Sequence, residues 1–299
     1  MNRMPLPSVE TLSADEFLAR FDDADTHKRT QLIQMFKIAT QELEALSNSD
    51  SSAIEPPQIR IRIAEELQAE ANPWAIYVNE GLVNYYLNLT EPPILEIIPE
   101  LKEHSPFFND SYFYRKMAFM WMVLHEFFHS RREHNEVAKA VGISKETWLA
   151  IEMDADLLAT ARVYRHAQQR YQNFYSDLFV RKLTLSFLYW GFRGLPEPEG
   201  DDSHPSSIDR LGMMMQKLIM LRRVQEDPPD PDFKLEESKA NLEPIFICFI
   251  NCELAFSKYT GVKPDLPSIE KFCSGITRPI VVRWDEMRSH VTRLSRTPA

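Results

Sequence analysis

The sequence HEFFH, from His125 to His129, combines two residues that bind metal ions with one that can move a proton. Residues four positions apart lie on one face of a helix, so His125 and His129 can bind the same ion. Glu126 projects about a quarter-turn away, where it can reach a water molecule bound to that ion. The pattern indicates a metal-dependent hydrolase, although two histidines placed by chance in a core helix would give the same letters.

A catalytic zinc ion needs a third protein ligand, and His134 is the first position to test. It would fit the metzincin pattern HExxHxxGxxH only with glycine at position 132 and histidine at position 135. The chain has Arg132 and Asn135 there, and His134 falls on another face of a continuous helix. We therefore exclude His134 as a ligand.

Glu152 is the preferred third ligand, because it lies on a separate helix among apolar residues, where an unpaired charge is costly. Asp156 follows four positions later and shares its face, so it can accept the spare ring N–H of a ligating histidine. Asp154 lies between them and is expected to point away. Two alternatives stay open: Asp156 as the ligand with Glu152 behind it, or a solvated face that binds no metal.

Two helices are predicted to hold these residues in place. The motif helix begins near Asp110 and continues to about Val141, and Gly142 ends it. Ser144 begins the next helix, which carries the candidate third ligand.

The remaining pattern predicts a mainly α protein with a small β-sheet (α+β). Strict alternation at 59–63 and the β-forming residues 74–78 indicate two strands, which can pair as a hairpin. We expect an N-terminal helical segment at 1–55, a catalytic core at 56–225 and a C-terminal helical segment at 226–299, packed as one unit.

Composition argues against several classes of protein. The net charge of −10 argues against a nucleic-acid partner, and no apolar run approaches the length of a membrane span. The first residues lack the apolar stretch of a signal peptide, so we expect a cytoplasmic protein. The three cysteines, Cys248, Cys252 and Cys273, are an odd number that does not indicate a disulfide framework, and the first two are expected to be buried.

HEFFH followed by Glu152 and Asp156 resembles the gluzincin metallopeptidases, especially the HtpX and CAAX-protease type. Their pattern is HExxH, a further histidine five residues on, and then ExxAD. His134 occupies the position of the further histidine. The resemblance implies a zincin-like core and a zinc ion bound by His125, His129 and Glu152.

Two further stretches carry the same resemblance, which covers roughly 59–225. NPWAIYVNEGL at 72–82 is similar to the segment that supplies an edge strand before the motif helix, and SHPS at 203–206 with Arg210 is similar to the segment after the glutamate helix. The chain lacks the family's membrane helices, and Phe128 replaces the usual glycine of HELGH. In size and outline the chain also resembles the phage-exclusion Lit-type peptidases, which are soluble bacterial HExxH proteins that cleave a host translation factor.

The resemblance implies further roles. His204 would stabilise the oxyanion, with Tyr164 or Tyr171 as alternatives. The strand with Trp74, Ile76 and Val78 would bind the substrate backbone by strand addition, unless it serves only for packing.

We therefore expect a zinc-dependent endopeptidase in which Glu126 is the general base and Asp156 supports a ligating histidine. Its substrate would be a protein or peptide, and a regulatory partner or phage infection would switch it on. The alternative is a regulatory or binding protein that keeps a zincin scaffold with autoinhibited or no turnover, capped by 1–50 or 226–299. A helical structural protein with an accidental motif would require several coincidences at once.

Overall fold

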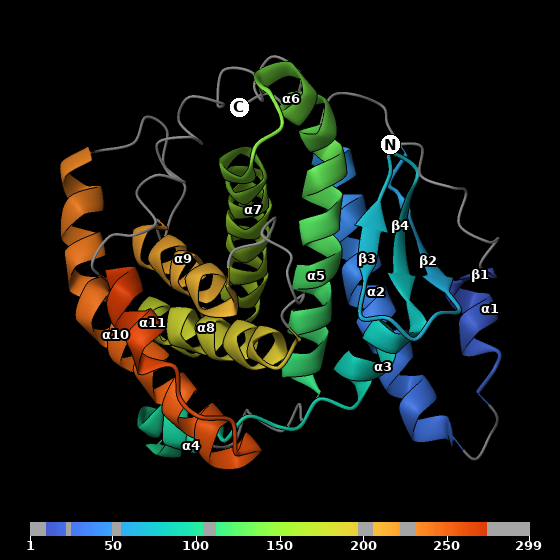
Figure 1. The fold of residues 1–299 in the computed structure, drawn as a ribbon. Coiled ribbons are helices and arrows are strands. Elements are labelled where there is room, and N and C mark those ends of the chain that lie inside the picture. The colour runs from blue at the N-terminus through green and yellow to red at the C-terminus, as the bar shows by residue number, and fades with distance from the viewer. Residues whose placement is uncertain are drawn as a thin grey trace.

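One long helix, α5 (Phe113–Arg131), carries the HEFFH sequence through the middle of the molecule. In the computed structural model, which describes residues 10–21, 25–49, 55–103, 112–196, 206–221 and 231–273, this helix separates a small sheet from a group of helices (Figure 1). It packs against α2 (Thr26–Ser49) and α3 (Glu80–Leu87) on the sheet side. On the other side it packs against α7 (Lys145–Tyr171) and α8 (Asp177–Arg193).

The sheet has four strands in the order β1-β2-β4-β3. The strands are β1 (Thr11–Ser13), β2 (Gln58–Arg62), β3 (Ala69–Ala71) and β4 (Ala75–Asn79). The predicted hairpin between the first two recognised strands is wrong, because β2 and β4 are parallel. The hairpin joins β3 to β4 instead, through a turn in which the side chain of Asn72 accepts hydrogen bonds from the backbone N–H groups of Trp74 and Ala75.

Alternation along the strands places one face of the sheet in the core. Ile59, Ile61, Ile76 and Val78 are buried, whereas Arg60 is only half-buried between them on the opposite face. The buried face packs on α2 and α5. The predicted fold class, mainly helical with a small sheet, is confirmed.

The other described helices pack around these elements, some beside the sheet and α2 and others on the side of α7 and α8. They are α1 (Ala14–Leu18), α4 (Ile94–Ile97), the 3-10 helix η2 (Pro99–Glu103), α6 (His134–Val141), α9 (Ser207–Met220), α10 (Pro231–Thr260) and α11 (Leu266–Cys273).

The predicted motif helix is interrupted. It ends at Arg131, and Glu133 adopts a left-handed conformation with φ of 51° before α6 begins. The end at Gly142, with φ of 91°, agrees with the prediction, and Ser144 caps α7 by accepting a hydrogen bond from Thr147 N–H. The start predicted near Asp110 lies outside the described residues.

Within the described part of the chain, one segment is long and apolar enough to cross a membrane: Ser238–Thr260 in α10. Core helices pass the same test, and α10 packs against α8 and α9. Cys248 and Cys252 are buried there as free thiols, as expected. A helix predicted near 278–296 falls outside the described residues.

Candidate metal centre

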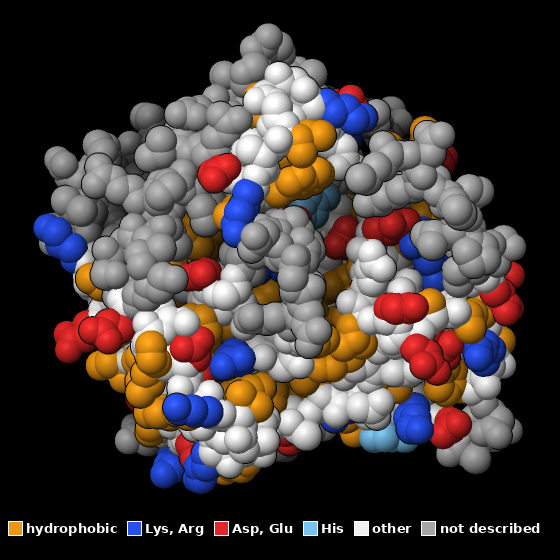
Figure 2. Space-filling model, viewed as in Figure 1, with side chains coloured by type: hydrophobic (Ala, Val, Ile, Leu, Met, Phe, Trp, Pro, Cys, Tyr) orange, Lys and Arg blue, Asp and Glu red, His pale blue; other side chains and the backbone are white. Residues whose placement is uncertain are grey.

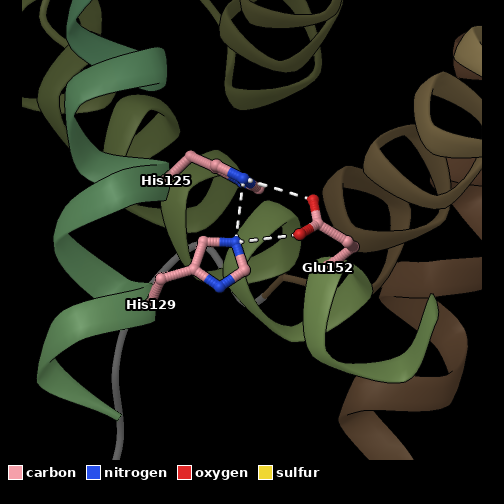
Figure 3. A group of neighbouring side chains, drawn as sticks. All are labelled: His125, His129 and Glu152. Atoms are coloured by element: carbon pink, nitrogen blue, oxygen red, sulfur yellow. Dashed lines mark hydrogen bonds and ion pairs between the residues drawn. The ribbon is translucent and has the colours of Figure 1, made fainter. Parts of the chain in front are cut away.

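The side chains of His125, His129 and Glu152 converge from α5 and α7 (Figure 3). One ligand atom from each lies within 4.8 Å of the others, so the group could hold a metal ion. The two Nε2 nitrogens are 3.0 Å apart, and the Glu152 oxygens lie 3.4 Å from Nε2 of His125 and 3.3 Å from Nε2 of His129. Two imidazoles and a carboxylate form a donor set that suits zinc and leaves a coordination position for water.

Close packing of α5 on α7 brings these side chains together. The apolar neighbours of Glu152 in α7, Ala150, Ile151 and Ala155, are fully buried. On α5, the indole of Trp121 stacks on the ring of His125 with centroids 5.4 Å apart, and its N–H donates to Thr160 Oγ1 at 3.2 Å. These contacts hold one face of the His125 ring.

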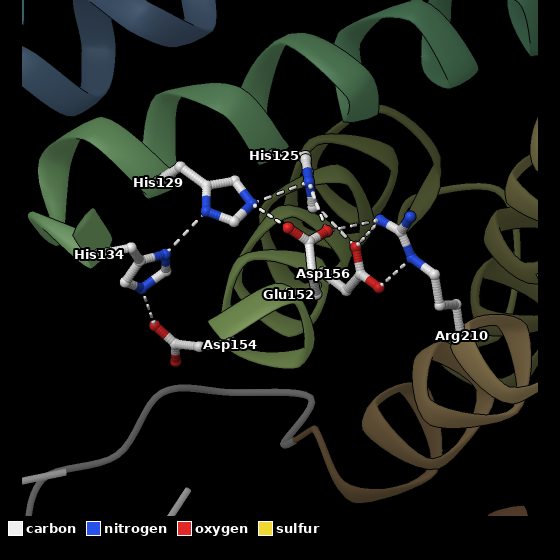
Figure 4. Close-up of polar contacts among 7 residues, drawn as sticks. All are labelled: His125, His129, His134, Glu152, Asp154, Asp156 and Arg210. Carbon is white, nitrogen blue, oxygen red and sulfur yellow. Dashed lines mark hydrogen bonds and ion pairs between the residues drawn. The ribbon is translucent and has the colours of Figure 1, made fainter. Parts of the chain in front are cut away.

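Asp156 and Arg210 support His125 from behind (Figure 4). Asp156 Oδ1 lies 2.8 Å from His125 Nδ1, although the N–H direction is poorly aligned with the oxygen. Arg210, on α9, donates to both oxygens of Asp156, at 2.7 and 2.6 Å. Its guanidinium lies 4.6 Å from the ring centroid of Phe192 and 5.9 Å from that of Trp121. Asp156 therefore occupies the position predicted for the partner of a ligating histidine, with Glu152 in front of it.

His129 has a different support, made by His134 and Asp154 (Figure 4). The Nδ1 nitrogens of His129 and His134 are 3.0 Å apart, and His134 Nε2 lies 3.1 Å from Asp154 Oδ2. Arg132 donates to the same oxygen at 3.2 Å. The expectation that Asp154 points away is wrong: its side chain is buried, because the break at Glu133 turns His134 back toward α7.

The electrostatics of the metal-free centre favour the form that binds metal at His129 and Glu152, but not at His125. Burial lowers the pKa of His129 well below its usual range, so its ring is neutral. Burial alone would raise the pKa of Glu152, but His129, His125 and Arg210 outweigh burial and hold it well below the usual range. Burial also opposes the charge on His125, yet the close carboxylates of Asp156 and Glu152 raise its pKa to about 10. His125 must therefore lose a proton to act as a ligand.

A cavity of about 600 Å³ opens onto the cluster. Figure 2 shows it as a hollow with histidine and acidic side chains between apolar ones. Glu126 lines the cavity beside the two histidines, and burial raises its pKa to about 7. One wall is strand β3 and its flanks, from Leu67 to Ala71. Phe128 does not line the cavity but packs against the core, with its ring 5.4 Å from that of Phe127.

The predicted substrate strand is in the wrong place. β4 is paired on both sides, and its Ile76 and Val78 are fully buried. Trp74 is 73% exposed and lines a separate hollow with Arg60 and Tyr77. The edge strand on the cavity is β3, which the sequence analysis missed because AEA is short and poor in β-forming residues.

The structure tests only two of the three predicted oxyanion donors. His204 lies outside the described residues. Tyr164 and Tyr171 do not line the cavity, and the hydroxyl of Tyr164 donates to Asp177 at 2.5 Å.

A model of one protein family, described as Peptidase U49, matches residues 10–223. The match confirms the expectation of a peptidase and agrees with the resemblance to Lit-type peptidases; features specific to the HtpX and CAAX type stay predictions. No curated protein and no solved structure matches the chain significantly.

Proposed function

The chain belongs to the Peptidase U49 family, and we propose that it is a zinc-dependent endopeptidase that cleaves a protein substrate. The observation that supports this most strongly is the position of Glu126. Its carboxyl lines the same cavity as the His125, His129 and Glu152 cluster. A proton acceptor beside three metal ligands is the arrangement that peptide hydrolysis by activated water requires.

His125, His129 and Glu152 would hold the zinc ion. When bound there, zinc would polarise the substrate carbonyl and lower the pKa of water. Glu126 takes the proton of the attacking water and passes it to the leaving amine. A pKa of about 7 suits both transfers, because the group accepts and releases a proton near neutrality. Asp156, held by Arg210, keeps His125 oriented toward the ion. We retain His204 as the proposed oxyanion donor on the resemblance alone.

Strand β3 supports substrate binding by strand addition. Asn72 N–H donates to Ala75, and Asn79 N–H donates to Gln68. Because backbone groups alternate in direction along an antiparallel pair, the N–H and C=O groups of Ala69 and Ala71 face away from β4. These two residues line the cavity, so an extended substrate can pair with them in front of Glu126.

The biological setting is proposed by resemblance. A Lit-type role would make this a protease of phage defence, regulated by infection or by a protein partner. Among the described residues, no structural observation favours the alternative of a regulatory protein on the same scaffold, since Glu126 and the three candidate ligands are all present.

A cell-based comparison of wild type and Glu126→Gln tests the proposal. Both proteins are expressed in a bacterial host, with and without phage challenge, and mass spectrometry identifies new protein termini. Glu126→Gln should bind zinc as wild type does and produce no new termini. Glu136→Gln, an exposed glutamate on α6, is the control and should cleave normally. A wild-type protein that binds zinc but yields no new termini under either condition would favour the regulatory protein.

A further inference from the structure

Behind His129, the second histidine of the motif, a hydrogen-bonded series runs through the buried side chains of His134 and Asp154 to the partly exposed Arg132. Both ring nitrogens of His134 are engaged, since Nδ1 lies 3.0 Å from His129 Nδ1 and Nε2 lies 3.1 Å from Asp154 Oδ2. Its side chain is 2% exposed. No ring nitrogen is left for a metal ion, so His134 is not a ligand, and its effect must pass through His129.

The directions of these hydrogen bonds follow from one condition, that His129 binds zinc through Nε2. If His129 binds zinc through Nε2, its only ring proton is on Nδ1, and that proton must be donated to Nδ1 of His134. His134 then carries its own proton on Nε2 and donates it to Asp154. Arg132 fixes the accepting oxygen at 3.2 Å. Along this series His129 and His134 each donate one ring proton to the next residue, and Asp154 accepts from both His134 and Arg132.

We propose, on the basis of the function proposed above, that His134 is a positioning residue that sets the tautomer and ring orientation of His129 for zinc binding. It does for His129 what Asp156 does for His125, with a neutral imidazole between the ligand and the carboxylate. Such outer partners raise metal affinity because they fix the ligand before the ion arrives.

The backbone supports this assignment. In a continuous helix, a residue five positions after His129 would lie about 140° around the axis from it. The left-handed conformation of Glu133 breaks the helix and returns His134 to the side of His129. A non-glycine residue in this conformation costs on the order of 1 kcal/mol, and such strain gathers at functional sites.

Zinc affinity of two His134 variants tests the proposal. Each purified protein competes with a chromophoric chelator for zinc, and the visible spectrum of the cobalt-substituted protein reports ligand geometry. His134→Phe fills the space without accepting a hydrogen bond, so its zinc affinity should fall about 10- to 100-fold with an altered cobalt spectrum. His134→Asn keeps an acceptor near the position of Nδ1 and should recover most of the loss.

Thermal unfolding of the metal-free proteins separates positioning from folding. His166→Phe is the matched control, because His166 also contacts a carboxylate, Glu42 of α2 at 2.7 Å, but about four turns further along α7 than Glu152. It should leave zinc affinity unchanged. Wild-type affinity in His134→Phe, or an equal loss in His134→Asn, would overturn the proposal while leaving the endopeptidase intact. A wild-type protein that binds no zinc would overturn both.

Discussion

Arg210 on α9 forms a two-pronged hydrogen bond with Asp156 on α7, and through it reaches His125 on α5. Three helices separated in sequence are thus joined at one carboxylate that is 1% exposed. The guanidinium also lies 3.7 Å from Glu152 Oε2, so one cation faces both Asp156 and Glu152. Burial disfavours that cation, but Asp156 and Glu152 outweigh burial and raise the pKa of Arg210 further.

We expect Arg210→Met to weaken zinc binding about 10- to 100-fold, because Asp156 would lose the partner that orients it toward His125. Arg210→Lys should recover only part of the loss, since an ammonium cannot donate in the same paired geometry. Chelator competition measures both variants. Equal zinc affinity in wild type and Arg210→Met would show that Asp156 needs no orienting partner.

Glu152→Gln should remove the third ligand. A neutral amide is a poor zinc ligand, so the purified protein should fall from about one zinc ion per chain to far below one. Glu146→Gln, an exposed position in the first turn of the same helix, should keep its full zinc content. Elemental analysis after dialysis gives the ratio. Undiminished zinc in Glu152→Gln would restore Asp156 as the candidate ligand.

The position of α5, which carries His125 and His129, depends on its close approach to α8. A Cβ atom at Gly191 would lie 2.3 Å from the Cβ of Ala118. Gly191→Ala should therefore destabilise the fold by about 1–3 kcal/mol, despite the better helix propensity of alanine. Adding Ala118→Gly should relieve the overlap, so the double variant should be more stable than additivity predicts. Urea denaturation of the four proteins measures this coupling, and simple additivity would argue against direct contact.

Substrate binding along β3 can be tested by removing one outward N–H group. Ala71→Pro deletes a donor that faces the cavity and leaves the bonds to β4 in place. Cleavage of the substrate identified by terminal analysis should slow about fivefold to tenfold, the value of one lost hydrogen bond. Ala71→Val keeps the N–H and should cleave at close to the wild-type rate. Equal rates for the two variants would place the substrate elsewhere.

The stability that Glu253 contributes, away from the metal centre, should depend on pH. Burial alone would raise its pKa, but hydrogen bonds from Arg193, Tyr189 and the backbone N–H of Asp265 outweigh burial and lower it. A carboxyl whose pKa is lower in the folded state than in the unfolded state stabilises the fold at pH values above the unfolded-state pKa. This stabilisation is lost as the pH falls through the folded-state pKa. Glu253→Gln should therefore unfold with about 2 kcal/mol less stability at pH 7, and the difference should shrink as the solution is acidified below about pH 4. Denaturation at several pH values measures it, and a constant difference would contradict the ionic contribution.

Local patterns in the sequence predicted local structure well. The spacing of His125 and His129 and the apolar setting of Glu152 located the cluster, and the Ile and Arg alternation at 59–63 located β2 and its buried face. Each of these signals lies within one element, where the period of the chain decides which side is buried.

The relations between elements were not predictable in the same way. Strand pairing is a non-local property. The expected hairpin joined β2 to β4, whereas β4 forms its hairpin with β3, a strand that was not predicted. The break at Glu133 has neither glycine nor proline to announce it, so His134 and Asp154 were placed on the wrong sides. Arg210 lies 54 positions from Asp156. Only the resemblance to the gluzincin segment after the glutamate helix indicated that Arg210 belongs to the site.

The left-handed residue at position 133 also bears on how such sequences are compared. A helical break exchanges the neighbours of every later residue while leaving the spacing of the letters unchanged. Two chains with the same histidine five positions after HExxH would thus build different surroundings for their metal, according to whether the helix continues. Searches for sites of this kind should therefore align the conformation at that position before they align the histidine.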